Sequence, residues 1–100
     1  MDVSSQIKDG KLFRQQCYID GQWVGADSGE TIDVTDPSDG GKIGTIPKMG
    51  AAETRRAIEA ANRAWPAWRK KTAKERATVL RRWFDLMMEN QDDLAKLMTI

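Results

Sequence analysis

The feature that most constrains this chain is a change in hydrophobic period at Gly50. Before it, apolar and polar residues alternate, as in TIDVT at 31–35, which is the period of a half-buried strand. After it, small and apolar side chains recur at helical spacing, at Ala57, Ile58, Ala61 and Trp65. The sequence therefore predicts an α/β chain, with strands and turns over 17–49 and helices over 51–100.

Turn signals divide the region before Gly50 into short strands. Asp20-Gly21 predicts a two-residue hairpin turn within CYIDGQWV, because glycine adopts positive φ without steric cost. The stretch DPSDGGK predicts a turn between TIDVT and a second extended strand, KIGTIPKM. Pro47 is expected at the edge or the end of that strand, since proline cannot donate to a ladder of hydrogen bonds.

Two long helices are predicted after the period change. The first has a mostly alanine stripe, so we expect it to lie close to its neighbour and to end at Pro66. Thr72 and Glu75 form a capping-box pattern that opens the second. The second helix carries apolar side chains on more than one side: Ala73, Ala77, Val79, Leu80, Trp83, Phe84, Leu86, Met87 and Met88. Such a helix needs cover on more than one side.

A third helix is expected to begin at Asn90, with that residue as its cap. Asp92 and Asp93 would lie in its first turn, where the helix dipole favours negative charge and explains both acids. No glycine cap or proline stop precedes Ile100. We therefore expect the helix, and the protein, to continue.

Composition limits the environment and the partners. The net charge is +1, which gives no general attraction to nucleic acid or to acidic membranes. One cysteine excludes an internal disulfide and favours a reducing compartment. No apolar run is long enough for a signal peptide or a membrane span, so a cytoplasmic location is expected. Residues 1–16 are expected to be a mobile polar leader, anchored by Leu12 and Phe13.

Few residues are candidates for chemistry. Cys17 is the only thiol, but the chain has no histidine to activate it, so a strand residue is the favoured interpretation. The Gly40–Lys42 stretch lacks the earlier glycine and the following hydroxyl of a phosphate loop. An EF-hand counted from Asp36 would place Pro47 where a glutamate is needed. The residues alone therefore define no catalytic, cofactor-binding or side-chain metal site.

The order and spacing of these motifs resemble the opening of the aldehyde dehydrogenase superfamily. The motifs are YIDGQW, VTDP, GGKIGTIP, AIEAANRAWPAW and the run from TAKER to LAKLMT, and the resemblance covers residues 12–100. Within the superfamily, LFRQQ, PKMG and the long helical run resemble bacterial succinate-semialdehyde dehydrogenases. Glutarate-semialdehyde dehydrogenases share much of this segment.

The resemblance implies the N-terminal part of the aldehyde dehydrogenase fold, with short β-hairpins and three helices that brace the cofactor-binding domain. It implies a homo-oligomeric enzyme that uses NADP or NAD to oxidise succinate semialdehyde to succinate through a cysteine downstream of this chain. The segment alone would then be inactive. In some members, the backbone carbonyls that correspond to Val34 and Thr35 hold a monovalent cation.

Two other interpretations stay open. The wide apolar helical face would also suit a small stand-alone interaction module that docks on a partner. The basic run Arg69, Lys70, Lys71, Lys74 and Arg76, with Trp65 and Trp68, would suit contacts to phosphates and bases. That last interpretation predicts binding that depends strongly on salt.

Overall fold

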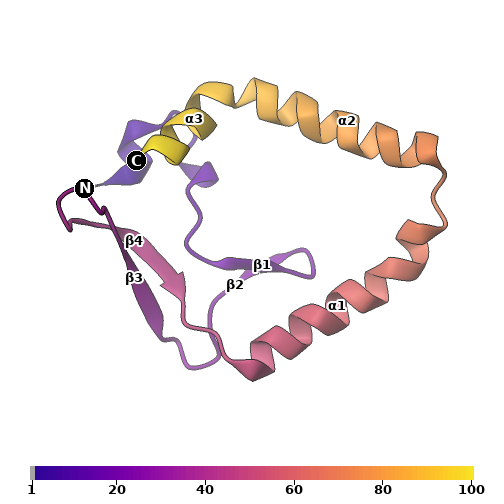
Figure 1. Ribbon diagram of the computed structural model, residues 1–100, viewed down its shortest axis with the longest axis horizontal. Coiled ribbons are helices and arrows are strands. Elements are labelled where there is room, and N and C mark those ends of the chain that lie inside the picture. The colour runs from indigo at the N-terminus through magenta and orange to yellow at the C-terminus, as the bar shows by residue number, and fades with distance from the viewer. Residues whose placement is uncertain (1) are drawn as a thin grey trace.

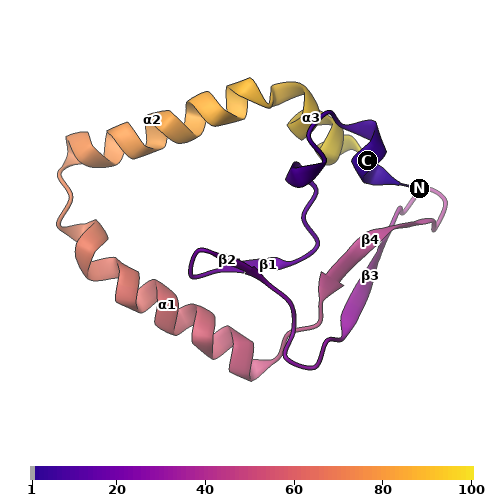
Figure 2. The ribbon, with the colours of Figure 1, turned by 180° about the vertical axis from the view of Figure 1, so that it is seen from behind.

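A computed structural model describes residues 2–100; Met1, the first residue of the predicted leader, lies outside the described residues. The second β-hairpin and the three α-helices outline an open ring, the first hairpin lies inside it, and the two ends of the chain lie near each other (Figure 1). The view from behind shows the same arrangement (Figure 2). The molecule is flat, measuring 48 × 35 × 20 Å along its principal axes. Its elements meet mostly near their ends and do not stack into layers.

The first hairpin pairs β1 (Cys17–Ile19) with β2 (Gln22–Val24) in antiparallel register, as predicted. Asp20 and Gly21 form the turn with φ angles of 52° and 76°. Both angles lie in the left-handed region, which is the geometry of a primed hairpin turn. The Asp-Gly signal in the sequence thus fixes the register of this hairpin.

The second hairpin pairs β3 (Thr31–Thr35) with β4 (Lys42–Pro47), also antiparallel. The register shifts between Val34 and Thr35, so that β4 has one residue more than β3 at this point. Pro47 ends β4, as predicted. Among the described residues the two hairpins form separate two-stranded sheets.

Helix α1 (Ala51–Arg69) begins at the predicted change of period. The prediction that Pro66 ends this helix is wrong, because the helix continues through the proline to its last residue. Proline removes one hydrogen bond to the preceding turn. Beyond the proline, at the end of α1, Nη2 of Arg76 from the next helix donates to the carbonyls of Trp68 and Arg69 at 3.4 and 3.0 Å.

Helix α2 (Ala73–Glu89) begins with the predicted capping box. The Thr72 hydroxyl accepts from the backbone N–H of Glu75 at 3.2 Å, and the Glu75 carboxylate accepts from the backbone N–H of Thr72 at 3.4 Å. These two bonds satisfy donors that a helix start otherwise leaves free.

None of the helices among the described residues is long and apolar enough to cross a membrane.

Helix α3 (Gln91–Thr99) follows α2 after a single residue, Asn90. Asn90 is the cap residue by position, as predicted, but its side chain does not cap α3. Its Nδ2 instead donates back to the carbonyl of Leu86 at 2.9 Å, which closes the end of α2. The chain turns sharply here, and α3 returns toward the N-terminus (Figure 1).

The N-terminal segment forms two short 3₁₀ turns, η1 (Val3–Gln6) and η2 (Gly10–Leu12). Val3 and Ile7 are buried, with exposed fractions of 2% and 7%. The prediction that Leu12 and Phe13 are the only anchor of this segment is therefore wrong. Those two residues are half-buried, whereas Val3 and Ile7 are buried. Two isolated apolar residues in a polar run have no period that the sequence could reveal.

Candidate functional site

The first hairpin and the start of α1 enclose a cleft of about 380 Å³. Its charged lining comes from the hairpin, the loop after it and α1: Asp20, Asp27, Glu53, Arg56, Glu59 and Arg63. Acidic and basic side chains are mixed within it. Four of these six side chains are acidic and two are basic, so the cleft carries a small excess of negative charge.

The charges in this cleft are largely paired with one another. Nη2 of Arg56 lies 2.6 Å from Oδ1 of Asp27, and this hydrogen bond and the charge of Asp27 raise the pKa of Arg56. Nη2 of Arg63 lies 3.6 Å from Oδ2 of Asp20 in the hairpin turn. The buried carboxylate of Glu53 accepts from the backbone N–H of Asp27 at 3.3 Å. These contacts hold the hairpin and its loop against α1.

Cys17 lies in β1, as predicted, and is half-buried opposite Val24 of β2. A nucleophilic cysteine needs a base or a positive neighbour that stabilises its thiolate. The chain contains no histidine that could serve as that base. The position suits a small side chain in a strand.

The backbone carbonyls of Val34 and Thr35, implied by the resemblance as cation ligands, lie at the register shift of the second hairpin. Such a shift disrupts the ladder of backbone hydrogen bonds locally. Hard cations such as Ca²⁺ take about six to eight oxygen ligands, so two carbonyls would be only part of a set. Within residues 2–100 no group of three or more His, Cys, Asp or Glu side chains could hold a metal ion.

The basic run lies at the corner between α1 and α2. Its last residue, Arg76, has its guanidinium 5.7 Å from the ring centroid of Trp68 and also donates to the carbonyls at the end of α1. One of the five cations and one of the two indoles of this candidate site are thus engaged with each other. The structure gives these two residues a role in fixing the corner.

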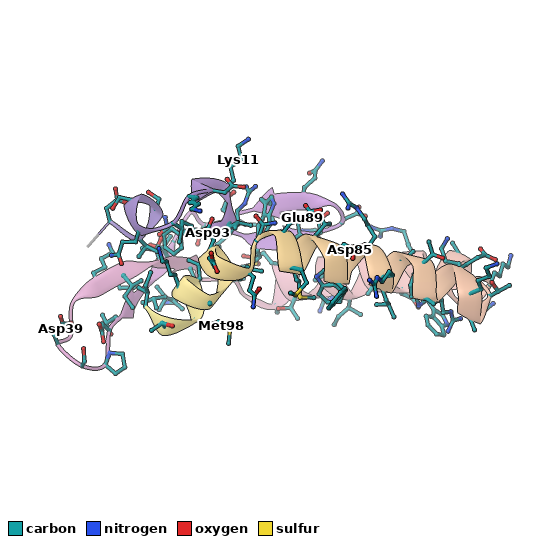
Figure 3. The ribbon with its side chains drawn as sticks, turned by 90° about the horizontal axis from the view of Figure 1, so that it is seen from above. Lys11, Asp39, Asp85, Glu89, Asp93 and Met98 are labelled. Carbon is teal, nitrogen blue, oxygen red and sulfur yellow. The ribbon has the colours of Figure 1, made fainter. Side chains whose placement is uncertain are left out.

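The first turn of α3 holds an unexpected contact. Oδ1 and Oδ2 of Asp93 accept from the backbone N–H groups of Lys8 and Asp9, both at 2.9 Å. Figure 3 shows Asp93 between α3 and the N-terminal segment. The bonds from Lys8 and then Asp9 lower the pKa of the Asp93 carboxyl. The prediction that the helix dipole alone explains Asp92 and Asp93 is therefore wrong for Asp93, and the sequence carries no signal for its distant partners.

The side chains predicted to need cover do lie open on α2. This α2 apolar face consists of Val79, Leu80, Trp83, Phe84, Leu86, Met87 and Met88, each 40% to 60% exposed. Contiguous apolar surface of this kind marks an interaction site in a soluble protein. It is a candidate interface, whereas the charged cleft is a structural joint.

The sequence and the structure of this chain both match known proteins. The aldehyde dehydrogenase family profile matches residues 23–100. The glutarate-semialdehyde dehydrogenase of Pseudomonas aeruginosa is 73% identical over 95 residues, which are 95% of this chain and 20% of that protein. The NADP⁺ succinate-semialdehyde dehydrogenase of Escherichia coli is 65% identical, with the same coverage. A crystal structure of an E. coli NADP-dependent enzyme matches with a TM-score of 0.88 and 67% identity, over 93% of this chain and 19% of that one.

The hairpins and helices thus define one portion of a larger α/β fold. The chain belongs to the aldehyde dehydrogenase family. It spans about a fifth of the length of the curated relatives it matches. The predicted fold class, short β-hairpins followed by three helices from the N-terminal part of the aldehyde dehydrogenase fold, is confirmed.

Proposed function

We propose that this chain is the N-terminal portion of a semialdehyde dehydrogenase that oxidises succinate semialdehyde to succinate with NADP or NAD. The observation that carries the proposal is identity of 73% and 65% with two such enzymes over 95% of the chain. Their names share a substrate type, an aldehyde with a carboxylate at the far end. Glutarate semialdehyde, one methylene longer, is the alternative substrate that the first relative suggests.

In this proposal the catalytic cysteine and the cofactor site lie outside these residues. Cys17 has no histidine in the chain to activate it, and the charged cleft on α1 is internally paired. Residues 17–49 and 51–100 would form part of the NAD(P)-binding domain. The chain by itself would be inactive.

The α2 apolar face would brace the rest of the enzyme. Its side chains are 40% to 60% exposed here, and burying such side chains is the main favourable term in domain packing. We also propose that the backbone carbonyls of Val34 and Thr35 help to hold a monovalent cation, supported by the register shift at that point. Further oxygen ligands would have to come from elsewhere in the enzyme.

We place the enzyme in the cytoplasm, as a homo-oligomer. The lone cysteine fits a reducing compartment. The oligomeric state is measured directly by light scattering of the purified protein.

The test begins with the intact mass of the protein that its source cell makes. We expect a mass several times the 11.3 kDa of these residues. The purified protein should then reduce NADP⁺ or NAD⁺ only when a semialdehyde is present. Parallel assays with succinate and glutarate semialdehyde decide the substrate by the ratio of the two kcat/KM values.

A second function is favoured by the α2 apolar face alone: a stand-alone module that docks on a protein partner. It predicts that the source cell makes a protein of 11.3 kDa. It also predicts no aldehyde-dependent reduction of a nicotinamide cofactor by that protein. Either result would contradict the dehydrogenase proposal.

A further inference from the structure

The N-terminal strap, residues 2–12, crosses α3 and joins the two ends of the ring (Figures 1 and 2). Its firmest contacts reach across the sequence, since Lys8 and Asp9 lie 85 and 84 residues before Asp93. Both oxygens of the Asp93 carboxylate accept a backbone N–H from the strap at 2.9 Å. The side chain is buried, with 6% of the residue exposed.

This geometry resembles a small anion-binding nest, in which successive backbone N–H groups point at one negative charge. Hydrogen bonds to an ionised acceptor are about twice as strong as neutral ones. Water competes weakly for Asp93 because the residue is buried. The paired bonds therefore form a specific fastening between strap and helix.

Two further contacts support the fastening. Val3 and Ile7, which are both buried, belong to the strap. Nζ of Lys96, three residues after Asp93 on α3, lies 3.5 Å from the carbonyl oxygen of Gln6. Lys8 of the strap and Lys96 of α3 both favour the ionised form of the carboxylate. The acidic residues Asp9, Glu89 and Asp92 line the same hollow as Asp93.

The strap also has a local structure of its own. The Asp2 carboxylate accepts from the backbone N–H of Ser4 at 3.2 Å, and the Asp9 carboxylate accepts from that of Lys11 at 3.1 Å. These bonds cap its two 3₁₀ turns. A short segment with its own caps, held to the rest of the chain mainly at α3, can open as a unit, as cooperative local openings do.

We propose that residues 2–12 form a releasable strap whose clasp is Asp93. When closed, the strap joins the N-terminal segment to α3 and completes the ring. When open, it uncovers α3 and the α2–α3 junction, while the other helices keep their structure. The proposal concerns motion of the strap and does not depend on the proposed function.

The first test uses the unmodified full-length protein and amide hydrogen exchange at several low denaturant concentrations. We expect the Lys8 and Asp9 amides to exchange through a local opening that is nearly independent of denaturant. Amides in the middle of α2 should respond steeply, because their exchange needs a larger exposure of surface. The same denaturant dependence in both places would overturn the proposal.

The second test compares Asp93→Asn with Asp92→Asn in the same protein. An asparagine at 93 keeps one acceptor but turns an NH₂ group toward the second strap N–H. We expect exchange at Lys8 and Asp9 to rise about tenfold or more, as loss of a charge-assisted bond implies, with α2 unchanged. Asp92→Asn should leave both rates unchanged. An unaltered strap, an equal rise in α2, or a protein that fails to fold with Asn at 93 would each contradict a separately opening strap.

Discussion

Glu53 and Asp93 are buried charged side chains in the first turns of α1 and α3, with 7% and 6% exposure. A buried carboxylate is costly unless hydrogen-bond donors replace the water it loses. Here the donors are backbone N–H groups of distant segments, at Asp27 for Glu53 and at Lys8 and Asp9 for Asp93. Each helix start thereby fixes a non-helical segment.

Acid is expected to loosen the strap. The bonds from Lys8 and then Asp9 hold the pKa of Asp93 below its ordinary value. Because the folded pKa is the lower one, the stabilisation is complete above the unfolded value of about 4 and is lost as the pH falls through the folded pKa. Amide exchange at Lys8 and Asp9, corrected for its intrinsic pH dependence, should therefore be steady near neutral pH and rise below about pH 4. The Asp93→Asn protein should lack this rise, and a flat wild-type profile would contradict the prediction.

Gly44 is expected to resist substitution. An added Cβ would lie 2.7 Å from Oε1 of Gln15 and 3.0 Å from Cζ of Phe13. Moving Gln15 would break its bond to the backbone N–H of Thr45, now 2.8 Å. Gly44→Ala should therefore lower the free energy of unfolding by about 1 kcal/mol, measured by denaturant titration. Gly25→Ala is the matched control, because no atom lies within 4 Å of its added Cβ; equal effects would show that the contact at Gly44 is unimportant.

At the level of elements, the parts that could be predicted depend on short-range chemistry. The Asp20-Gly21 turn and the Thr72–Glu75 box are each specified within four residues, and both are present. The prediction for Pro66 failed because a proline removes only one bond within a helix, and α1 continues for about one further turn to Arg69. The carbonyls at that end accept from an arginine of α2. A rule based on neighbouring residues cannot include a donor from the next helix.

The candidate sites divide in the same way. The exposed face of α2 was predictable, because its excess of apolar residues lies within one continuous stretch of the sequence. The contacts of Glu53 and Asp93 were not predictable. The partner of Glu53 lies 26 residues away in the sequence, and the partners of Asp93 lie 84 and 85 residues away. The assignment of Val34 and Thr35 as cation ligands depends on the resemblance alone. Every residue has a backbone carbonyl, so the residue types give no sign of this role.

The capping box of α2 supplies a test at this scale. Thr72→Ala removes the acceptor for the backbone N–H of Glu75 and should cost about 1 kcal/mol of unfolding free energy. Thr78→Ala is the control, because that hydroxyl bonds only the Lys74 carbonyl, one turn earlier in the same helix. Its effect should stay within roughly 0.5 kcal/mol. Thermal or denaturant unfolding of both variants measures the difference, and equal losses would show that the box contributes little.

Considered as a whole molecule, the ring leaves apolar surface on the outside of a flat chain. The radius of gyration is 16.7 Å, whereas a compact domain of 100 residues has a value of about 13 Å. An extended shape of this kind places few side chains out of water. Cover from outside residues 2–100 is therefore the simplest account of the α2 apolar face.

This account predicts opposite effects of one substitution in two settings. Residues 1–100 produced alone should self-associate, because the α2 apolar face has no cover, and Trp83→Ser should reduce that association. In the full-length protein the same change should lower stability by about 3 kcal/mol, as for a buried tryptophan that is truncated. Size-exclusion chromatography with light scattering measures the first effect, and denaturant unfolding measures the second. A monomer of residues 1–100 that melts sharply and reversibly would show that this face needs no cover, and the bracing role proposed for α2 would then be wrong.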